Sequence, residues 1–227
     1  MSNFQTMTVA CPACGKPADY QAVHSVNADR RADLREAILA DAFQSNDCPH
    51  CRTNFRLDPE FVYVHAARAQ WIGAYPLAKL AQWQALEQST PALFERTYGA
   101  EASPKLQEIG RGLKPRITFG WGGLREKVFL AERGLDDVTI ELCKAAVLRG
   151  SESSPIDAQS ELRLIDANAE QLVFGWLRAS DQNVGDRVGV ARSLYDEIAA
   201  DADGDWAELR EGITAGWFVD LSRLMLA

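Results

Sequence analysis

The sequence predicts an α+β protein: a small β-rich, zinc-ribbon-like module with an inserted helix, then a helical middle and a compact α+β C-terminal unit. Three observations lead to this prediction. Two Cys-Pro-x-Cys motifs lie in the first quarter of the chain, among short runs of β-branched and aromatic residues. Apolar residues then recur at helical spacing, and beyond residue 160 they alternate with the period of two that is typical of strands. The expected divisions are 1–75, 76–150 and 156–227, with residues 151–155 as a linker.

The first module is expected to hold four short strands and one helix. Between the cysteine motifs, Leu34, Ala37 and Ile38 form an apolar stripe that predicts a helix over 29–43, with Asp29 as its N-cap. This helix accounts for a gap of 33 residues between the motifs, which is longer than the roughly 15 to 20 residues of a simple zinc ribbon. β-Branched and aromatic residues between turn signals predict strands at 5–10, 18–26, 53–57 and 61–66.

The four paired cysteines predict a metal site. They are Cys11, Cys14, Cys48 and Cys51, and in each motif two intervening residues let both sulfurs face one ion. Proline pre-sets the turn, and Gly15 after the first motif permits a left-handed conformation. Arg52 replaces that glycine in the second motif, so we expect a less regular turn there without loss of a ligand. Four thiolates close a tetrahedral shell, which predicts one structural Zn²⁺ per chain.

Other interpretations of these residues are weaker. A redox dithiol needs one motif opening a helix after a strand and gives no reason for a second motif. His50 lies within the second motif, where it cannot easily reach inward, and His24 and His65 lie in strand-like runs. The three histidines have no spacing typical of catalytic zinc. An unmetallated site or a different metal remains open.

These residues resemble the CpXC family of bacterial and archaeal proteins. The resemblance covers about residues 5–76 and rests on the two cysteine motifs together with 26–27, 33–39, 55–56 and 71–72. Arg52 departs from the family pattern. The resemblance implies the four cysteine ligands and supplies no catalytic residue.

The middle of the chain is expected to be helical. Leu77, Leu80, Trp83 and Leu86 follow Pro76 at helical spacing. Thr90 and Ser103, each before a proline, look like N-caps, which predicts separate helices ending at Gly99 and Gly112. The glycine-rich run at 120–123 lacks the phosphate-loop and dinucleotide patterns, so we interpret it as a turn before a helix that ends at Gly134.

A buried helix is expected next. Residues 136–149 are apolar almost all round, interrupted mainly by Glu141 and Lys144. Cys143 is expected to be a small buried hydrophobe within this helix, and Asp136 and Asp137 to cap its N-terminus.

The C-terminal third is expected to form a small α+β unit. Alternating apolar residues predict a hairpin at 162–176 that turns near Asn168, with a third strand over 186–190. Ser193 with Asp196 and Asp205 with Glu208 look like capping boxes for helices at 194–201 and 206–212, before a final segment at 217–226.

Composition limits the partners. The chain carries 24 basic and 32 acidic residues, a formal charge of −8, which disfavours nonspecific binding to nucleic acid or anionic membranes. Residues 1–75 hold seven basic and eight acidic groups, so no basic patch is expected there. The N-terminal residues 1–9 have neither a positive region nor an apolar run, and we expect a cytoplasmic protein with no membrane span.

The function that best fits is a zinc-stabilised protein-interaction or assembly (adaptor) protein, whose partner is another protein. Six tryptophans provide candidate interface anchors, although core packing is the commoner role, and we single out Trp71 and Tyr75 near the cysteines. Two alternatives remain. One is a nucleic-acid-binding regulator, and the other is an enzyme whose site assembles from scattered residues. The sequence contains no Gly-x-Ser-x-Gly elbow, histidine–carboxylate cluster or phosphate loop, so it identifies no catalytic or cofactor-binding residue.

Overall fold

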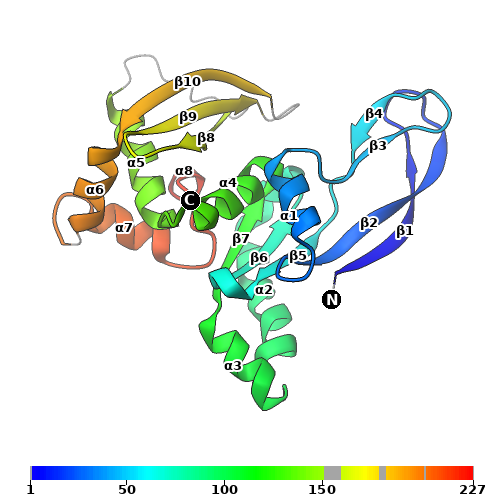
Figure 1. Cartoon of the computed structure of the whole chain (residues 1–227), viewed down its shortest axis with the longest axis horizontal. Helices are drawn as coiled ribbons and strands as arrows, with labels where there is room; N and C mark the ends of the chain where they lie inside the picture. Colours follow the sequence, from blue (N-terminus) through cyan, green and yellow to red (C-terminus); the bar gives the residue numbers. More distant parts are fainter. Residues whose placement is uncertain (1, 151–159, 179–182, 202, 227) are drawn as a thin grey trace. The chain divides into compact units, whose positions relative to one another are not determined.

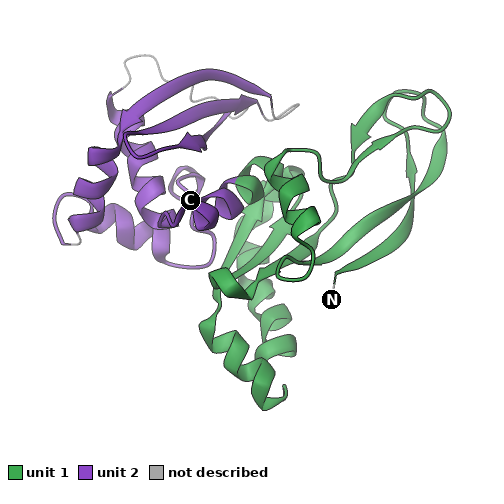
Figure 2. Cartoon of the chain, viewed as in Figure 1, with its two compact units in different colours: residues 1–125 green, residues 126–227 purple. Residues whose placement is uncertain are grey.

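The computed structural model describes residues 2–150, 160–178, 183–201 and 203–226, and it has the predicted α+β architecture (Figure 1). The chain forms two compact units, residues 1–125 and 126–227 (Figure 2). The expected division near residue 75 falls inside the first unit. The expected linker, 151–155, lies outside the described residues. Separate folding of 1–75, 76–150 and 156–227 stays a prediction. Within the described part of the chain, no helix has both the length and the apolar character needed to cross a membrane.

Unit 1 is built on a five-stranded mixed sheet in the order β1-β2-β5-β6-β7. β1 and β2 pair antiparallel, as do β5 and β6, whereas β2–β5 and β6–β7 are parallel. The strands are β1 (Asn3–Ala10), β2 (Pro17–Asn27), β5 (Phe61–His65), β6 (Gln70–Tyr75) and β7 (Lys114–Phe119). Two strands of this sheet therefore lie outside the expected set, as does the short strand at Ser45–Asp47. β6 was not assigned from the sequence, and β7 lies within the range expected to be helical, because its pairing with β6 is a contact between distant parts of the chain.

The hairpin of β1 and β2 extends well beyond the rest of this sheet. β2 pairs with β5 only from Ser25 to Asn27, while β1 accompanies β2 along almost its whole length. We call the part of the hairpin before Ser25 the hairpin arm. A second, two-stranded sheet of β3 (Ser45–Asp47) and β4 (Asn54–Arg56) lies beside the far end of this arm (Figure 1).

The inserted helix is shorter than expected. α1 covers Ala32–Leu39, because Asp41 and Gln44 take positive φ angles of 58° and 61° that end the helix. Asp29 is not its N-cap. The Asp29 carboxylate instead accepts hydrogen bonds from the backbone N–H groups of Ala66 and Ala67, at 2.7 and 3.0 Å, at the start of the 3-10 turn η1 (Ala66–Arg68).

The helices between β6 and β7 differ from the prediction in one respect. A 3-10 turn, η2 (Leu77–Gln82), leads into α2 (Trp83–Tyr98), which passes through Pro91 without a break. Thr90 is therefore not an N-cap. Its hydroxyl donates to the Leu86 carbonyl at 2.5 Å inside a continuous helix. α3 (Pro104–Gly112) begins after Ser103 as expected, although the Ser103 side chain makes no capping bond.

The glycine-rich run at 120–123 is helical. It forms the first turn of α4 (Gly120–Arg133), which was expected to start later. Trp121 in this turn is 6% exposed because it packs on Phe61 and Phe43, with ring centroids 5.7 and 5.8 Å away. Arg56 covers the same indole at 4.1 Å. This aromatic contact explains why a sequence with three glycines adopts a helix here.

Unit 2 contains the later part of α4 and a three-stranded antiparallel sheet in the order β10-β9-β8. The hairpin, the third strand and the later helices agree with the sequence prediction, and Asn168 Oδ1 accepts the N–H groups of Glu170 and Gln171 at the expected turn. N-caps differ: α6 begins after Ala191, so Ser193 is inside the helix. The elements are α5 (Asp137–Gly150), β8 (Ser160–Ala167), β9 (Gln171–Arg178), β10 (Val184–Ala191), α6 (Arg192–Ala200), α7 (Ala207–Thr214) and α8 (Ser222–Met225).

α5 is the buried helix that the sequence predicts. Residues 138–145 are all buried, Cys143 is 0% exposed, and the Asp136 carboxylate accepts the Thr139 N–H at 2.9 Å as an N-cap. The two polar interruptions are also buried: Glu141 is 0% and Lys144 is 2% exposed. The two side chains pair with each other, but sequence periodicity gave no sign of their burial, because their other partners, Glu126 and the Leu221 N–H, lie on other elements.

A network of buried charges surrounds Lys144. Its ammonium donates to Glu126 at 2.7 Å and to Glu141 at 2.9 Å. Arg163 of β8 donates to Glu126 at 3.1 Å and to Asp220 at 2.5 Å. Burial alone would raise the pKa of Asp220, but the positive charges of Arg163 and Lys144 hold it well below its ordinary value.

The same network binds the C-terminal segment to unit 2. Glu141 Oε2 accepts the Leu221 N–H at 2.9 Å, and Lys127 donates to the Val219 carbonyl at 2.6 Å. The network thus joins α4, α5, β8 and the chain after Trp217 by charged hydrogen bonds, which are stronger than neutral ones.

Candidate metal centre

The four paired cysteines lie in two loops at the ends of two hairpins. The first loop, 11–16, connects β1 to β2, and the second, 48–53, connects β3 to β4. Cys11 and Cys48 each come directly after a strand and are 2% and 1% exposed. Cys14 and Cys51 are exposed. The two hairpins therefore carry equivalent ligand pairs, each with one inner and one outer sulfur.

The two loops have the same backbone hydrogen bonds. The Cys11 N–H donates to Lys16 O at 3.0 Å, and the Gly15 N–H donates to Cys11 O at 2.8 Å. In the second loop, the Cys48 N–H donates to Thr53 O at 3.0 Å, and the Arg52 N–H donates to Cys48 O at 2.8 Å. Arg52 has a φ of 60° where Gly15 has 69°, so the expected irregularity of the second turn is wrong. The arginine accepts the left-handed conformation.

The sulfurs of the two loops lie close to one another. Cys11 Sγ is 3.7 Å from Cys51 Sγ, Cys14 Sγ is 3.8 Å from Cys48 Sγ, and all four lie within 4.8 Å of one another. A tetrahedron with metal–sulfur bonds of about 2.3 Å has edges of about 3.8 Å. The four cysteines fit a single metal ion that joins the two hairpins.

Backbone amides stabilise negative charge on the inner sulfurs. The N–H of Ala13 lies 3.4 Å from Cys11 Sγ, and the N–H of His50 lies 3.4 Å from Cys48 Sγ. Burial raises the pKa of Cys48, but the amides of Cys51 and His50 outweigh it and lower the pKa overall. Such N–H···S bonds favour the thiolate form that a metal requires.

The outer sulfurs differ from each other in their surroundings. Cys51 Sγ lies 3.3 Å from the Thr53 hydroxyl, and hydrogen bonding to Thr53 lowers the pKa of Cys51 to about 6. The Lys16 backbone lowers the pKa of Cys14, but desolvation and the three neighbouring thiols outweigh it and raise the pKa to about 11. Crowded thiols resist losing all their protons, and a bound cation removes this repulsion.

Histidine does not belong to the group of metal-ligating side chains found among the described residues. The His50 ring faces the first loop instead, with Nε2 3.2 Å from the Pro17 carbonyl. The ring is therefore a contact between the two hairpins. Cys143 is likewise absent from the cysteine group and lies in unit 2, as expected.

A small apolar cluster lies beneath the metal centre. Tyr20, Ala22 and Leu57 form its buried part, and Val9, Ala18 and Phe55 pack against it. The Tyr20 and Phe55 rings meet edge to face with centroids 5.2 Å apart. This cluster brings the β3–β4 hairpin onto the hairpin arm and so places the two cysteine pairs opposite each other.

The family model described as CpXC protein matches residues 9–144. The chain belongs to the CpXC family. The match continues past residue 76, where the resemblance noted in the sequence ends, and it includes β7, the last strand of the unit 1 sheet. No curated protein and no solved structure matches this CpXC chain.

The structure corrects the expected interface anchors. Trp71 is 2% exposed and packs edge to face on Phe94, with centroids 5.4 Å apart. Tyr75 is partly buried, shares a hydrogen bond of 2.6 Å with Thr90 and stacks on Phe119. All six tryptophans lie among the described residues, and each is buried or partly buried. The sequence around these tryptophans could not distinguish a buried position from an exposed one, because both kinds of position carry aromatic residues.

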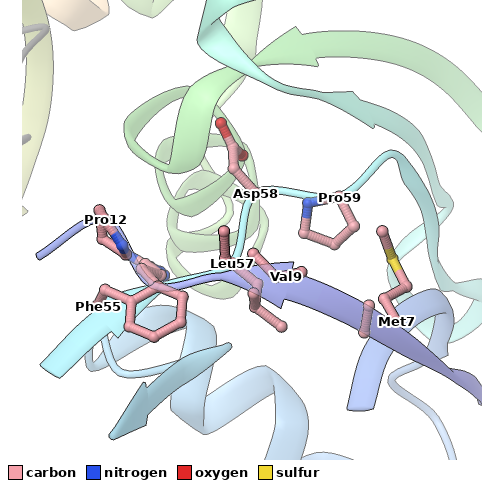
Figure 3. A pocket seen from close by; sticks show the side chains of 10 residues that line it. Met7, Val9, Pro12, Phe55, Leu57, Asp58 and Pro59 are labelled. Atoms are coloured by element: carbon pink, nitrogen blue, oxygen red, sulfur yellow. The ribbon is translucent and has the colours of Figure 1, made fainter. Parts of the chain in front are cut away.

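A surface feature that the sequence did not reveal lies beside the metal centre. A pocket of about 360 Å³ is bounded on one side by Met7, Val9 and Pro12 and on the other by the chain from Phe55 to Pro59 (Figure 3). The alternation of apolar residues in β1 could have indicated its wall, but the opposite wall comes from a segment about 50 residues away.

Proposed function

We propose that this CpXC protein binds one structural Zn²⁺ through Cys11, Cys14, Cys48 and Cys51 and acts as an interaction or assembly (adaptor) protein. The observation that carries the proposal is the spacing of sulfurs from different loops, which equals the edge of a tetrahedral zinc–thiolate site. All four positions of such an ion are filled by protein sulfurs. The zinc then has no open position for water or substrate, and its contribution is to structure.

A single zinc ion fits this arrangement better than two redox dithiols. Sulfur–sulfur distances of 3.7 and 3.8 Å join cysteines of different motifs, so each motif contributes to one shared site. A Cys-x-x-Cys redox pair uses its own two sulfurs, with one activated at a helix N-terminus. Both motifs here connect strands.

The adaptor role is favoured over nucleic-acid binding by the ion pairs that the arginines of the N-terminal part of the chain make. Arg31 pairs with Asp33 at 2.7 Å, and Arg56 pairs with Asp41 at 2.5 Å. Arg35 also lies 3.9 Å from Glu36. Phosphate contacts would have to compete with these carboxylates, on a chain that carries a net charge of −8.

Metal analysis of the purified chain tests the zinc assignment. We expect one zinc per chain, lost in Cys48→Ser and retained in the matched control Cys143→Ala, which removes the fifth thiol. Cobalt in place of zinc should give the absorption spectrum of a tetrahedral cobalt–thiolate site. A protein purified under reducing conditions with no metal, or with metal retained in Cys48→Ser, would contradict the assignment.

Affinity capture from the source organism tests the adaptor role. The zinc-loaded chain should retain a defined protein at about 0.15 M salt, and the Cys48→Ser chain should retain less of it because the hairpins separate. Retention of nucleic acid with a steep salt dependence would favour the regulator alternative. Retention of no macromolecule by the zinc-loaded chain would overturn the adaptor proposal.

A further inference from the structure

The hairpin arm has two edges, and one of them is covered by side chains. On the β2 edge, the Gln44 amide accepts the Val23 N–H at 3.0 Å and donates to Gln21 O at 3.2 Å. Farther along the same edge, Nε2 of the His50 ring lies 3.2 Å from the Pro17 carbonyl oxygen. Side chains therefore take the place that a neighbouring strand would occupy. This is a common way to protect the edge of a sheet.

The β1 edge is not covered by a strand. β1 ends the order of the five-stranded sheet, and no other strand of the described chain pairs with it. Because Val23 N–H and Gln21 O point away from β1, the residues that face them across the ladder, Phe4 and Thr6, direct their own N–H and C=O groups away from β2. By the same alternation, so does Thr8.

The composition of β1 does nothing to block strand addition. Its eight residues, Asn-Phe-Gln-Thr-Met-Thr-Val-Ala, include no charge, proline or glycine, and six of them are exposed. Natural edge strands are usually protected by lysine, proline, a bulge in the middle or a short length. β1 has a register irregularity only at its start, between Asn3 and Phe4.

An apolar pocket lies directly beside this edge. Met7 and Val9 of β1 form one wall, and Phe55, Leu57 and Pro59 form the other (Figure 3). Met7 is 42% exposed, a high value for a large apolar side chain. Two charged residues, Arg56 and Asp58, also line the pocket, and the Arg56 guanidinium is held by Asp41 and by the Phe43 carbonyl. The pocket has the size and lining to hold an apolar side chain of a bound segment.

We propose that the free edge of β1 binds an extended segment of a partner protein as an added strand, with an apolar side chain of that segment in the pocket beside Met7. The segment is uncharged where it faces β1 and has apolar residues at every second position, because alternate side chains of a strand face the same side. The backbone of Phe4, Thr6 and Thr8 supplies the hydrogen bonds. This proposal rests on the adaptor function and specifies the kind of partner.

The backbone contribution is tested at Thr6. Thr6→Pro removes an N–H that points away from β2, so the ladder between β1 and β2 keeps its bonds. Thr6→Val is the matched control, because it keeps the N–H and the β-branched shape. Met7→Lys tests the pocket by placing a charge at its wall. Each variant should retain one zinc per chain and the wild-type unfolding temperature within a few degrees, which shows that it folds.

The probe is a displayed library of random ten-residue peptides, selected on the zinc-loaded full-length chain. We expect enriched peptides with alternating apolar residues, whose affinity falls about tenfold or more in Thr6→Pro and in Met7→Lys and stays within about twofold in Thr6→Val. Amide hydrogen exchange gives a direct readout. The Thr6 and Thr8 amides should exchange quickly in the free chain and slowly with peptide bound, while the Met7 amide is protected in both states.

Three outcomes with the purified chain would overturn the docking proposal. The first is equal peptide binding by the wild type, Thr6→Pro and Met7→Lys, and the second is no enrichment of any peptide. The third is a dimer in sedimentation analysis that Thr6→Pro dissociates, which would assign the edge to a second copy. A native partner captured equally by the wild type and by both variants would leave the adaptor function intact and exclude the β1 edge, so the two failures are distinguishable.

Discussion

Arg52 occupies the same left-handed position as Gly15 in an otherwise equivalent loop. A residue with a Cβ pays a conformational cost there that glycine does not, so Arg52→Gly should stabilise the zinc-loaded chain by about 0.5–1 kcal/mol. Gly15→Ala should destabilise it by about 1 kcal/mol for the same reason, since a Cβ at Gly15 meets no atom within 4 Å and only the backbone resists.

Urea unfolding of the zinc-loaded variants measures both effects. Gly112→Ala is the control, because Gly112 also has open space around its Cβ position but has no positive φ. A gain in stability for Gly15→Ala, or a loss for Arg52→Gly, would show that the loops are not conformationally equivalent.

Lys144 is a second residue whose contribution to the free energy of unfolding depends on its surroundings. It is 2% exposed and bonded to two carboxylates, so Lys144→Met leaves Glu126 and Glu141 with fewer partners inside unit 2. We expect a loss of about 3–5 kcal/mol in the free energy of unfolding, because an uncompensated buried charge is costly. Lys105→Met at an exposed position should change stability by less than about 0.5 kcal/mol. Equal losses of stability for Lys144→Met and Lys105→Met in denaturant titrations would contradict the role of the buried network.

Asp220 should make this network sensitive to acid. Its pKa in the folded chain is lowered by Arg163 and Lys144 despite burial, so folding favours the ionised form. The resulting stabilisation is complete above the unfolded pKa, about 4, and disappears as pH falls through the lower folded pKa. Unfolding free energies measured from pH 6 to pH 2 should therefore fall less steeply in Asp220→Asn than in the wild type. The variant should also be less stable at neutral pH. Parallel pH profiles would rule out this role.

At the scale of elements, local signals predicted most strands and helices. They did not predict strands that depend on pairing with distant residues, or that two expected helices form one continuous helix. Thr90-Pro91 has the same local pattern as Ser103-Pro104, yet only the second pair begins a helix. In α2 the Thr90 hydroxyl bonds both Leu86 and Tyr75, and Tyr75 belongs to β6. β7 contains Pro115, which weakens a strand signal, but as the last strand of the sheet it can accept a proline.

The metal centre shows the same division between local and distant information. The four cysteines were predicted, because each pair is a local motif. The pocket beside Met7 and the covering of β2 by Gln44 were not predicted, because each joins segments that are far apart in the sequence. Their residue types, methionine and glutamine, carry no signal of such a role.

Pro91 gives a prediction at this scale. Inside α2 it cannot donate the hydrogen bond that residue 91 would make to Glu87, whereas Pro104 at the start of α3 loses no helical bond. Pro91→Ala should therefore raise the unfolding free energy by about 1–2 kcal/mol, and Pro104→Ala should leave it nearly unchanged or slightly reduced. Thermal unfolding of the two variants compares them directly. A loss of stability in Pro91→Ala would mean that the proline ring contributes more by packing than it costs in hydrogen bonding.

At the scale of the whole molecule, metal removal should loosen one part of the chain. All four ligands lie in unit 1, and the hairpin arm joins the larger sheet only through Ser25 to Asn27. After chelation, amide exchange should therefore accelerate over 3–24 and 45–57, because the binding free energy of such zinc sites, about 10 kcal/mol or more, is coupled to local folding. Protection over 138–148 and 162–177 should persist, since these residues belong to the core of unit 2. Equal loss of protection in both regions would show that the chain unfolds as one cooperative unit.

Gln44 also limits how far any assembly through the hairpin arm can grow. A strand pair with two open edges accepts a neighbour on each side, so each addition creates a new site and a fibre can propagate. With the β2 edge bonded by Gln44, an arm that accepts one strand at β1 offers no second site, and growth through the arm stops at that addition. Gln44→Ala would open the second edge, and its expected phenotype is concentration-dependent aggregation of a chain that still binds zinc. The Gln44 side chain thus allows the arm to bind one strand and prevents it from acting as a template for polymerisation.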